Sequence, residues 1–206
     1  MEQTFDLTII WAGLIGFGLM MYVLMDGFDL GQGILFPFAP NEKARDTMMN
    51  SVAPIWDGNE TWLVLGGAGL LAAFPLVYSV FLPALYIGVF LLLAGLIFRG
   101  IAFEFRFKAN KSKHLWSWSF AVGSTVASFA QGAVVGAYIQ GFETEGFVYS
   151  GGALDWLTPF TVITGLGLVA GYALLGSTWL ILKTEGELQE WNIINKKHSK
   201  EQQEEE

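Results

Sequence analysis

Long runs of apolar residues dominate this chain, and charged residues gather between the runs and at their ends. A helix that crosses a membrane needs roughly 20 mostly apolar residues. Stretches of this kind lie at about residues 7–37, 50–75, 79–103, 115–142 and 156–183. Segments of about ten residues with alternating polarity, which are typical of a membrane barrel, are absent from the pattern. The pattern therefore predicts an all-α polytopic membrane protein with five transmembrane helices in residues 1–183, followed by a polar tail in residues 184–206.

Composition supports a membrane protein. The 206 residues are 53% hydrophobic and only 15% charged, whereas an ordinary soluble domain carries about a quarter charged residues. This argues against a soluble enzyme, a disordered chain and a coiled coil. The formal net charge of -8 argues against a nucleic-acid partner, because such binding depends on clustered Lys and Arg. Since the chain has no cysteine, disulfides, thiolate zinc sites, iron–sulfur clusters and cysteine nucleophiles are excluded.

The basic residues predict the orientation of the chain in the membrane. With five spans and an external N-terminus, all eleven Lys and Arg fall on one side, in the 38–50 loop, the 99–114 loop and the tail. By the positive-inside rule this side is cytoplasmic. The N-terminus is therefore predicted to be extracytoplasmic and the tail cytoplasmic. The opening residues 1–6 are acidic rather than basic, so we expect the first helix to be a retained span and not a cleaved signal.

Candidate chemistry gathers at the predicted cytoplasmic ends of the first three spans. Two acidic pairs have i, i+3 spacing, which places both members of a pair on one helical face. The candidate residues are Asp26 with Asp29, Asp57 with Glu60, and Arg99 with Glu104. Charged groups near membrane depth usually face a bundle interior or water. Two interpretations remain open: a path for protons or cations, or interfacial caps and ion pairs, for example Arg99 with Asp57 or Asp26.

Histidine and tryptophan residues limit which cofactors and ligands the predicted spans could bind. The histidines are His114 and His198, both outside the predicted spans, so no span offers a histidine to ligate haem. Trp56 and Trp62 bracket the second acidic pair, and they fit either an interfacial belt or the lining of an apolar passage or quinone-tail site.

Small and amide residues predict helix–helix contacts. Gln131 and Gln140 are expected to bond to neighbouring helices rather than to a ligand. The glycines of residues 66–69 and 165–176 are expected to let helices approach closely.

Three ordered motifs resemble a known family. They are Asp-Gly-Phe-Asp-Leu-Gly at 26–31, Trp-Asp-Gly-Asn-Glu-Thr-Trp at 56–62, and Phe-Arg-Gly-x-x-Phe-Glu-Phe-Arg at 98–106. This set is similar to subunit II of the cytochrome bd quinol oxidases, and the resemblance runs from about Leu7 to Glu190. It implies a respiratory-chain enzyme of the bacterial or archaeal cytoplasmic membrane that oxidises quinol, reduces dioxygen to water and takes protons from the cytoplasm.

The resemblance also implies partners and cofactors. Subunit I is expected to hold two haems b and one haem d, whereas subunit II ligates no haem or metal, contributes a proton path and a dioxygen route, and holds a structural quinone. A small accessory subunit is a further expected partner.

The same resemblance suggests roles for individual residues. Asp57 is similar to the proton-path aspartate, Asp26 to an acidic residue near its entrance, and Trp62 to the tryptophan at the mouth of the dioxygen route. Asp29, Glu60, Arg99 and Glu104 match the motifs as supporting polar groups.

One departure from the family pattern stands out. The family subunit has eight spans in two four-helix bundles, whereas this chain is expected to contain the first four as an antiparallel bundle plus the first helix of the second. We therefore expect a truncated product, a split gene or a shifted reading frame. The alternatives to an oxidase subunit are a stand-alone proton or cation transporter and an assembly scaffold.

Overall fold

The computed structural model describes residues 6–186, 188–191 and 193, and it is predominantly α-helical, as predicted. In chain order the elements are α1 (Leu7–Leu35), the 3-10 helix η1 (Phe36–Phe38), α2 (Glu42–Val52), α3 (Trp56–Ala73), α4 (Pro75–Phe105), α5 (Lys113–Gln140), β1 (Thr144–Glu145), β2 (Val148–Tyr149) and α6 (Pro159–Lys183).

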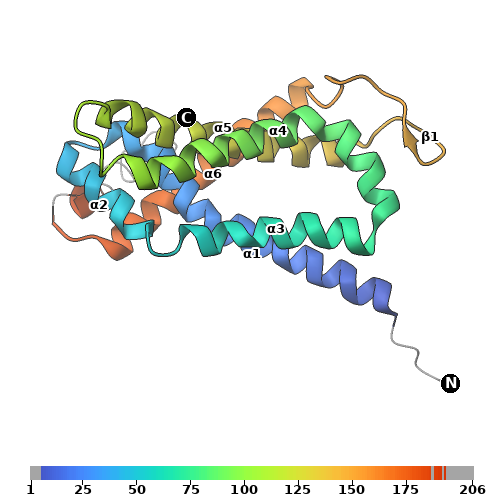
Figure 1. Cartoon of the computed structure of the whole chain (residues 1–206), viewed down its shortest axis with the longest axis horizontal. Helices are drawn as coiled ribbons and strands as arrows, with labels where there is room; N and C mark the ends of the chain where they lie inside the picture. Colours follow the sequence, from blue (N-terminus) through green and yellow to red (C-terminus); the bar gives the residue numbers. More distant parts are fainter. Residues whose placement is uncertain (1–5, 187, 192, 194–206) are drawn as a thin grey trace, which may run out of the picture.

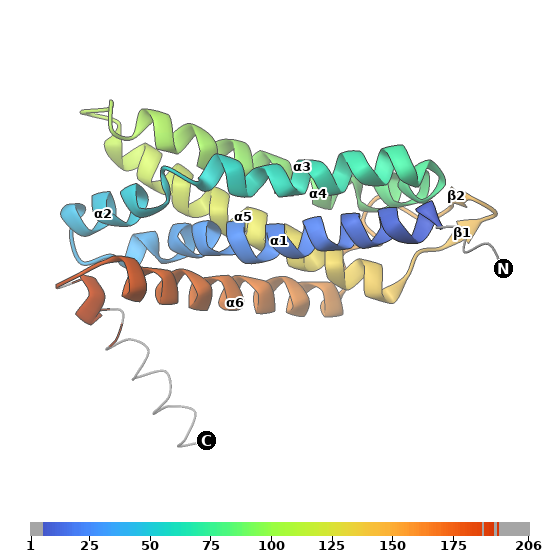
Figure 2. The ribbon, with the colours of Figure 1, turned by 90° about the horizontal axis from the view of Figure 1, so that it is seen from below.

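The long helices run lengthwise beside one another (Figures 1 and 2). α1 contacts α3, α5 and α6, while α4 packs mainly on α5. The short helix α2 lies at one end of the molecule, and the β1–β2 hairpin lies at the other (Figure 2). Because successive long helices run in opposite directions, the C-terminal part of α1, the start of α3 and the C-terminal part of α4 all lie at the α2 end.

Local sequence signals explain where the helices begin and end. Asp6 caps α1 by accepting a hydrogen bond from the Thr8 amide at 2.9 Å, and Thr158 opens α6 with a capping box. Pro75 begins α4 directly after Phe74, where α3 has ended, because proline suits the first helical position. Pro83, by contrast, lies inside α4, and the helix continues past it. Residues 56–105 are thus divided into two helices at Phe74-Pro75.

Length and composition qualify four of the described helical segments as membrane spans: Leu7–Phe38, Pro75–Phe105, Lys113–Gln140 and Pro159–Lys183. Their outer faces carry many exposed large apolar side chains, such as Phe90 and Ile163, which is typical of surfaces that meet lipid or another membrane protein. α3 occupies the remaining predicted span. It is shorter, with 18 residues, and carries Asp57, Asn59 and Glu60 in its first two turns.

The segment at 38–50, expected to be a loop, instead contains most of α2. This helix is amphipathic: Met48, Met49 and Val52 are buried, whereas Glu42 and Lys43 are exposed. Asn41 caps it by accepting from the Ala44 amide at 2.8 Å. Because α2 ends at Val52, the next helix begins at Trp56 rather than at residue 50. The expectation of a loop was wrong because the apolar residues of α2 are few and follow a charged turn.

The predicted polar tail is only partly described. Residues 188–191 are helical, and Leu188 is buried. The predictions for the opening residues before Asp6, for His198 and for the final acidic run lie outside the described residues.

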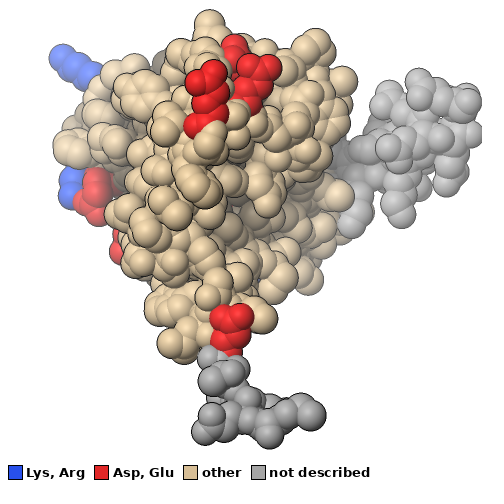
Figure 3. Space-filling model, turned by 90° about the vertical axis from the view of Figure 1, so that its right-hand side faces the viewer, with Lys and Arg blue, Asp and Glu red and all other residues tan. Residues whose placement is uncertain are grey.

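Charge is distributed unevenly between the two ends. The Lys and Arg of the described residues belong to the α2 end of the molecule: Lys43, Arg45, Arg99, Arg106, Lys108, Lys111, Lys113 and Lys183. The opposite end carries Asp6, Glu143, Glu145 and Asp155. In the view onto that end, acidic side chains face the viewer and basic ones appear only at the margin (Figure 3).

Candidate functional site: a buried ion-pair network

Arg99 lies at the centre of a network that joins three helices. Its Nη1 donates to Asp26 Oδ1 of α1 at 2.6 Å, and its Nη2 donates to Glu60 Oε2 of α3 at 2.7 Å. The side chains of Arg99 and Asp26 are fully buried, while that of Glu60 is 28% exposed. One charged group from each of α1, α3 and α4 therefore meets inside the helical assembly, with Glu60 toward its edge.

Asp29 extends the network by one helical turn. Its Oδ2 accepts a hydrogen bond from Asn59 Nδ2 at 2.9 Å, and the same amide reaches the Met25 carbonyl oxygen at 3.4 Å. Asp29 is fully buried, yet no cation pairs with it within the described residues. It is thus a carboxyl group held by a neutral amide close to a guanidinium that already serves two other carboxylates.

The i, i+3 spacing accounts for this geometry. Asp26 and Asp29 occupy one face of α1, and that face points into the assembly. On α3, however, the inward residues are Asn59 and Glu60, while Asp57 is exposed. The i, i+3 spacing groups Asp57 with Glu60 and gives no weight to Asn59, although Asn59 lies inside the same motif.

The other candidates lie around the network rather than in it. Asp57 is in the first turn of α3, on the exposed side. Glu104 is exposed and pairs with Lys108 at 2.9 Å, four residues further on. Trp56 stacks on Phe103 with ring centroids 4.9 Å apart, and Trp62 meets Phe17 edge-on at 6.0 Å. Both tryptophans are half-buried.

A second ionic cluster, which the spacing of charges did not predict, joins α2 to the end of α4 and to α5. The buried Arg106 donates to Asp46 at 2.6 Å, to Glu42 at 3.1 Å and to the Ser117 hydroxyl at 2.9 Å. Lys113 adds a bond to Asp46 at 3.1 Å. The signal available in the sequence was an arginine at the apolar end of a predicted span, together with two acidic residues in the 38–50 segment.

This cluster lowers the pKa of its two carboxyl groups. The hydrogen bond from Arg45, followed by the nearby positive charges of Arg106 and Lys113, lowers the pKa of Glu42. Partial burial alone would raise the pKa of Asp46, but the hydrogen bonds from Arg106 and Lys113 outweigh it and the pKa is lowered. Both carboxylates are consequently ionised at neutral pH.

Two amide predictions are confirmed. Gln131 accepts a hydrogen bond from the Tyr172 hydroxyl at 3.0 Å, which joins α5 to α6, and Gln140 accepts from Thr158 at 2.8 Å. His114 lies at the exposed start of α5, where its Nε2 accepts from Trp118 Nε1 at 2.9 Å.

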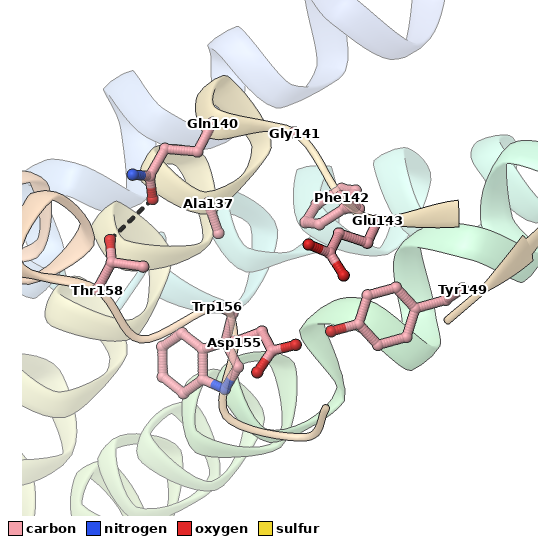
Figure 4. A pocket seen from close by; sticks show the side chains of 9 residues that line it. All are labelled: Ala137, Gln140, Gly141, Phe142, Glu143, Tyr149, Asp155, Trp156 and Thr158. Atoms are coloured by element: carbon pink, nitrogen blue, oxygen red, sulfur yellow. Dashed lines mark hydrogen bonds between the residues drawn. The ribbon is translucent and has the colours of Figure 1, made fainter. Parts of the chain in front are cut away.

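A hollow of about 480 Å³ lies at the opposite end of the molecule, beside the hairpin (Figure 4). Figure 4 shows the oxygen atoms of Glu143, Tyr149 and Asp155 facing the same space. Burial, then Asp155 and Glu143, raise the pKa of the Tyr149 hydroxyl. The hollow is far along the helices from Arg99 and shares no residue with its network.

The fold and this site define a polytopic helical membrane protein with a buried carboxylate–arginine network near its basic end. Comparison with known proteins identifies the family: the model for cytochrome bd terminal oxidase subunit II matches residues 7–197. The chain belongs to the cytochrome bd terminal oxidase subunit II family, as the three motifs had indicated.

Three relatives illustrate the match. The chain is 36% identical over 190 residues to the cytochrome bd-I ubiquinol oxidase subunit 2 of Escherichia coli (strain K12), covering 88% of this chain and 50% of that protein. It is 33% identical to a probable cytochrome oxidase subunit 2 of Haemophilus influenzae, covering 86% of this chain and 49% of that protein. It is 29% identical to the cytochrome bd ubiquinol oxidase subunit 2 of Bacillus subtilis, covering 87% of this chain and 54% of that protein. The chain therefore spans about half the length of these relatives.

Proposed function

We propose that this chain acts as a non-haem-ligating subunit of a membrane-bound quinol:dioxygen oxidoreductase of the cytochrome bd type, and that its buried network takes up protons from the cytoplasm. The observation that carries the proposal is the group formed by Asp26, Asp29 and Glu60 around the single guanidinium of Arg99. The relatives' names supply the reaction class, because they are called ubiquinol or cytochrome oxidase subunits.

The charge balance of this group favours the binding of a proton. If all three carboxyl groups were ionised, Arg99 would neutralise only one of them. A buried charge without a partner is costly, so binding a proton stabilises the network. Asp29 Oδ1 is a suitable atom for that proton, because it is buried and has no hydrogen-bond partner among the described residues.

The position of the group suits uptake from the cytoplasm. It lies toward the end of the molecule that carries the basic residues, which the positive-inside rule assigns to the cytoplasm. The side chain of Glu60 is partly exposed and Asp57 is exposed, so both offer carboxylates between solvent and the buried pair. In this scheme Asp57 collects protons at the mouth, and Glu60 leads to Arg99, Asp26 and Asp29, with Glu104 a supporting acid at the surface.

The remaining parts of the proposal concern arrangement and partners. α3 counts as the fifth span, so that α1, α3, α4 and α5 form the first bundle and α6 begins the second, with the N-terminus extracytoplasmic and the C-terminus cytoplasmic. Two haems b and one haem d belong to a partner subunit I. Trp62 and Trp56 line a dioxygen route or contact a structural quinone, and a small accessory subunit completes the assembly in the bacterial cytoplasmic membrane.

Affinity purification of the tagged chain from its native membranes tests the proposal. We expect haem b and haem d signals in the reduced-minus-oxidised spectrum of the purified complex, together with quinol-dependent oxygen uptake. Asp29→Asn should slow both oxygen uptake and the accompanying proton uptake while leaving the haem signals unchanged. A haem-free preparation that moves protons by itself would favour the transporter, and undiminished turnover in Asp29→Asn would favour the scaffold.

A further inference from the structure

The buried polar surface does not end at Asp26. Tyr22 precedes Asp26 by one turn of α1, is only 1% exposed, and interacts electrostatically with the Asp26 carboxyl group. Neither the Tyr22 hydroxyl nor Asp26 Oδ2 has a hydrogen-bond partner of good geometry among the described residues. The Tyr22 hydroxyl and the Asp26 carboxyl group therefore lie near one another, and each has an oxygen atom that can make a further hydrogen bond.

A second buried tyrosine lies on the other side of the same turn. The ring of Tyr172 of α6 occupies the space in which a side chain at Gly27 would lie, since a Cβ there would come within 2.8 Å of Tyr172 Cε1. Gly27 adjoins Asp26 in the sequence, so its lack of a side chain lets this phenol approach the acid. The Tyr172 hydroxyl donates to Gln131 of α5 at 3.0 Å, and the two residues are 1% and 7% exposed.

Tyr22 lies deeper in the membrane than the ion pair. α1 runs toward the basic end, so Tyr22 is farther from that end than Asp26, which in turn is farther than Asp29. Buried polar atoms in native proteins nearly always have a partner, and where protein supplies none, ordered water commonly does. A hydroxyl that both donates and accepts is suited to passing a proton along such a chain.

We propose that Tyr22, together with the Tyr172–Gln131 pair, continues the proton route from Asp26 toward the middle of the membrane. This inference rests on the proposed function, because it requires Asp26 to exchange protons. In each transfer the Tyr22 hydroxyl accepts a proton on its oxygen from Asp26, directly or through one water molecule, and releases its own to the next acceptor. The tyrosine ends each cycle unchanged, and no electron moves.

The test uses the assembled oxidase complex reconstituted in vesicles, with rates normalised to haem content. Tyr22→Phe removes one oxygen atom and keeps the ring. We expect it to slow proton uptake about tenfold, less than the roughly hundredfold loss typical of a missing acid or base, because water can partly replace a hydroxyl. The solvent deuterium isotope effect on turnover should rise, which a change in packing alone would not cause. Tyr86→Phe, on the exposed face of α4, is the matched control and should leave both measurements unchanged.

The outcomes separate this inference from the proposed function. If Asp29→Asn slows proton uptake and Tyr22→Phe does not, the route does not pass through the tyrosine and the inference is overturned while the function stands. If neither variant changes proton uptake, both fail. Should Tyr22→Phe not assemble, Tyr172→Phe decides in its place: a slowed rate with a raised isotope effect supports the route, and an unchanged rate overturns it.

Discussion

Arg99 of α4 and Asp26 of α1 form a buried ion pair that joins the two helices. The residues are 73 positions apart in sequence, Arg99 Nη1 lies 2.6 Å from Asp26 Oδ1, and both side chains are fully buried. Breaking a buried pair leaves an uncompensated charge, which is far more destabilising than the pair itself is stabilising. Because Glu60 uses the other terminal nitrogen of the same guanidinium, Arg99 fixes the spacing of three helices as well as the charge of the site.

Replacing Arg99 should therefore have a large effect on stability. Arg99→Met leaves Asp26 and Glu60 without a counter-charge, and we expect a loss of about 3–5 kcal/mol. The double variant Arg99→Met with Asp26→Asn should recover part of that loss, since it removes one of the stranded charges. Thermal unfolding of the detergent-purified complex measures both effects.

The exposed pair formed by Lys108 and Glu104 is the control. Lys108→Met removes a surface ion pair of similar length, 2.9 Å, whose side chains are 73% and 69% exposed. Such pairs contribute about 0–1 kcal/mol. Equal losses in Lys108→Met and Arg99→Met would contradict the assigned importance of burial.

Asp29 and Asp57 should respond differently to the loss of their charge. Asp29→Asn preserves the shape of a buried group and removes the atom proposed to hold the proton, so we expect proton-coupled turnover to fall about a hundredfold. Asp57→Asn, on the exposed turn, should slow turnover severalfold and leave haem content intact. The measurement is oxygen uptake per haem across a range of buffer concentrations. Mobile buffer can deliver protons in place of a surface carboxylate, so the loss in Asp57→Asn should shrink as the buffer concentration rises.

A separate result would contradict the prediction for Asp57. Wild-type turnover in Asp57→Ala at low buffer concentration would remove this residue from the route. It would leave the assignment of Asp29 untouched, because Asp29 lies on a different helix and contacts Asn59 rather than Asp57.

Much of the fold could be predicted from apolar patterning, because the cost of unbonded backbone in lipid restricts long apolar runs to helices. The start of α4 at Pro75 was also readable, since proline is favoured at the first helical position. The other proline of this stretch, Pro83, lies inside α4 and does not end it. α2 could not be read in the same way. Its apolar residues are few, and its acidic turn is held by Arg106 and Lys113, which lie far along the chain.

The site was partly readable for a similar reason. Spacing along one helix predicts which residues share a face, and it correctly paired Asp26 with Asp29. Spacing does not say which face turns inward, so it grouped Asp57 with Glu60 and overlooked Asn59. The partner of Arg99 was left open between Asp57 and Asp26, and only the packing of α1 against α3 and α4 resolves it in favour of Asp26 and Glu60.

The docking of α2 should depend on pH. The pKa values of Glu42 and Asp46 are lowered from their ordinary values of 4.5 and 3.8. Their contribution to docking is therefore fully present above those values and is lost as the pH falls through the lowered pKa values. We expect α2 to remain docked at neutral pH and to loosen only in acid.

A spin label can report this motion, because the chain has no cysteine of its own. Lys43→Cys places a nitroxide on the exposed side of α2. The label should become mobile in the parent chain only at acid pH, and in an Asp46→Asn background already at neutral pH. Equal mobility of the two proteins at neutral pH would show that Asp46 does not hold the helix.

The close contact of α1 with α6 at Gly31 predicts a final, purely steric effect. A Cβ at Gly31 of α1 would lie 1.8 Å from the Tyr172 carbonyl oxygen and 2.7 Å from the Gly176 amide nitrogen of α6. Backbone atoms cannot rotate away as side chains do, so Gly31→Ala must push α1 and α6 apart. Overpacking of this kind costs about 1–3 kcal/mol or more.

Gly171→Ala supplies the matched control, since a Cβ at Gly171 meets nothing within 4 Å. There the added methyl group should be neutral or stabilise α6 by up to about 1 kcal/mol through helix propensity. Thermal unfolding and the yield of assembled complex distinguish the two variants. Because Asp26, Asp29 and Gly31 share one helix, we also expect Gly31→Ala to slow proton uptake by displacing both acids. A Gly31→Ala complex with unchanged stability and turnover would mean that α1 and α6 are not in contact along this turn.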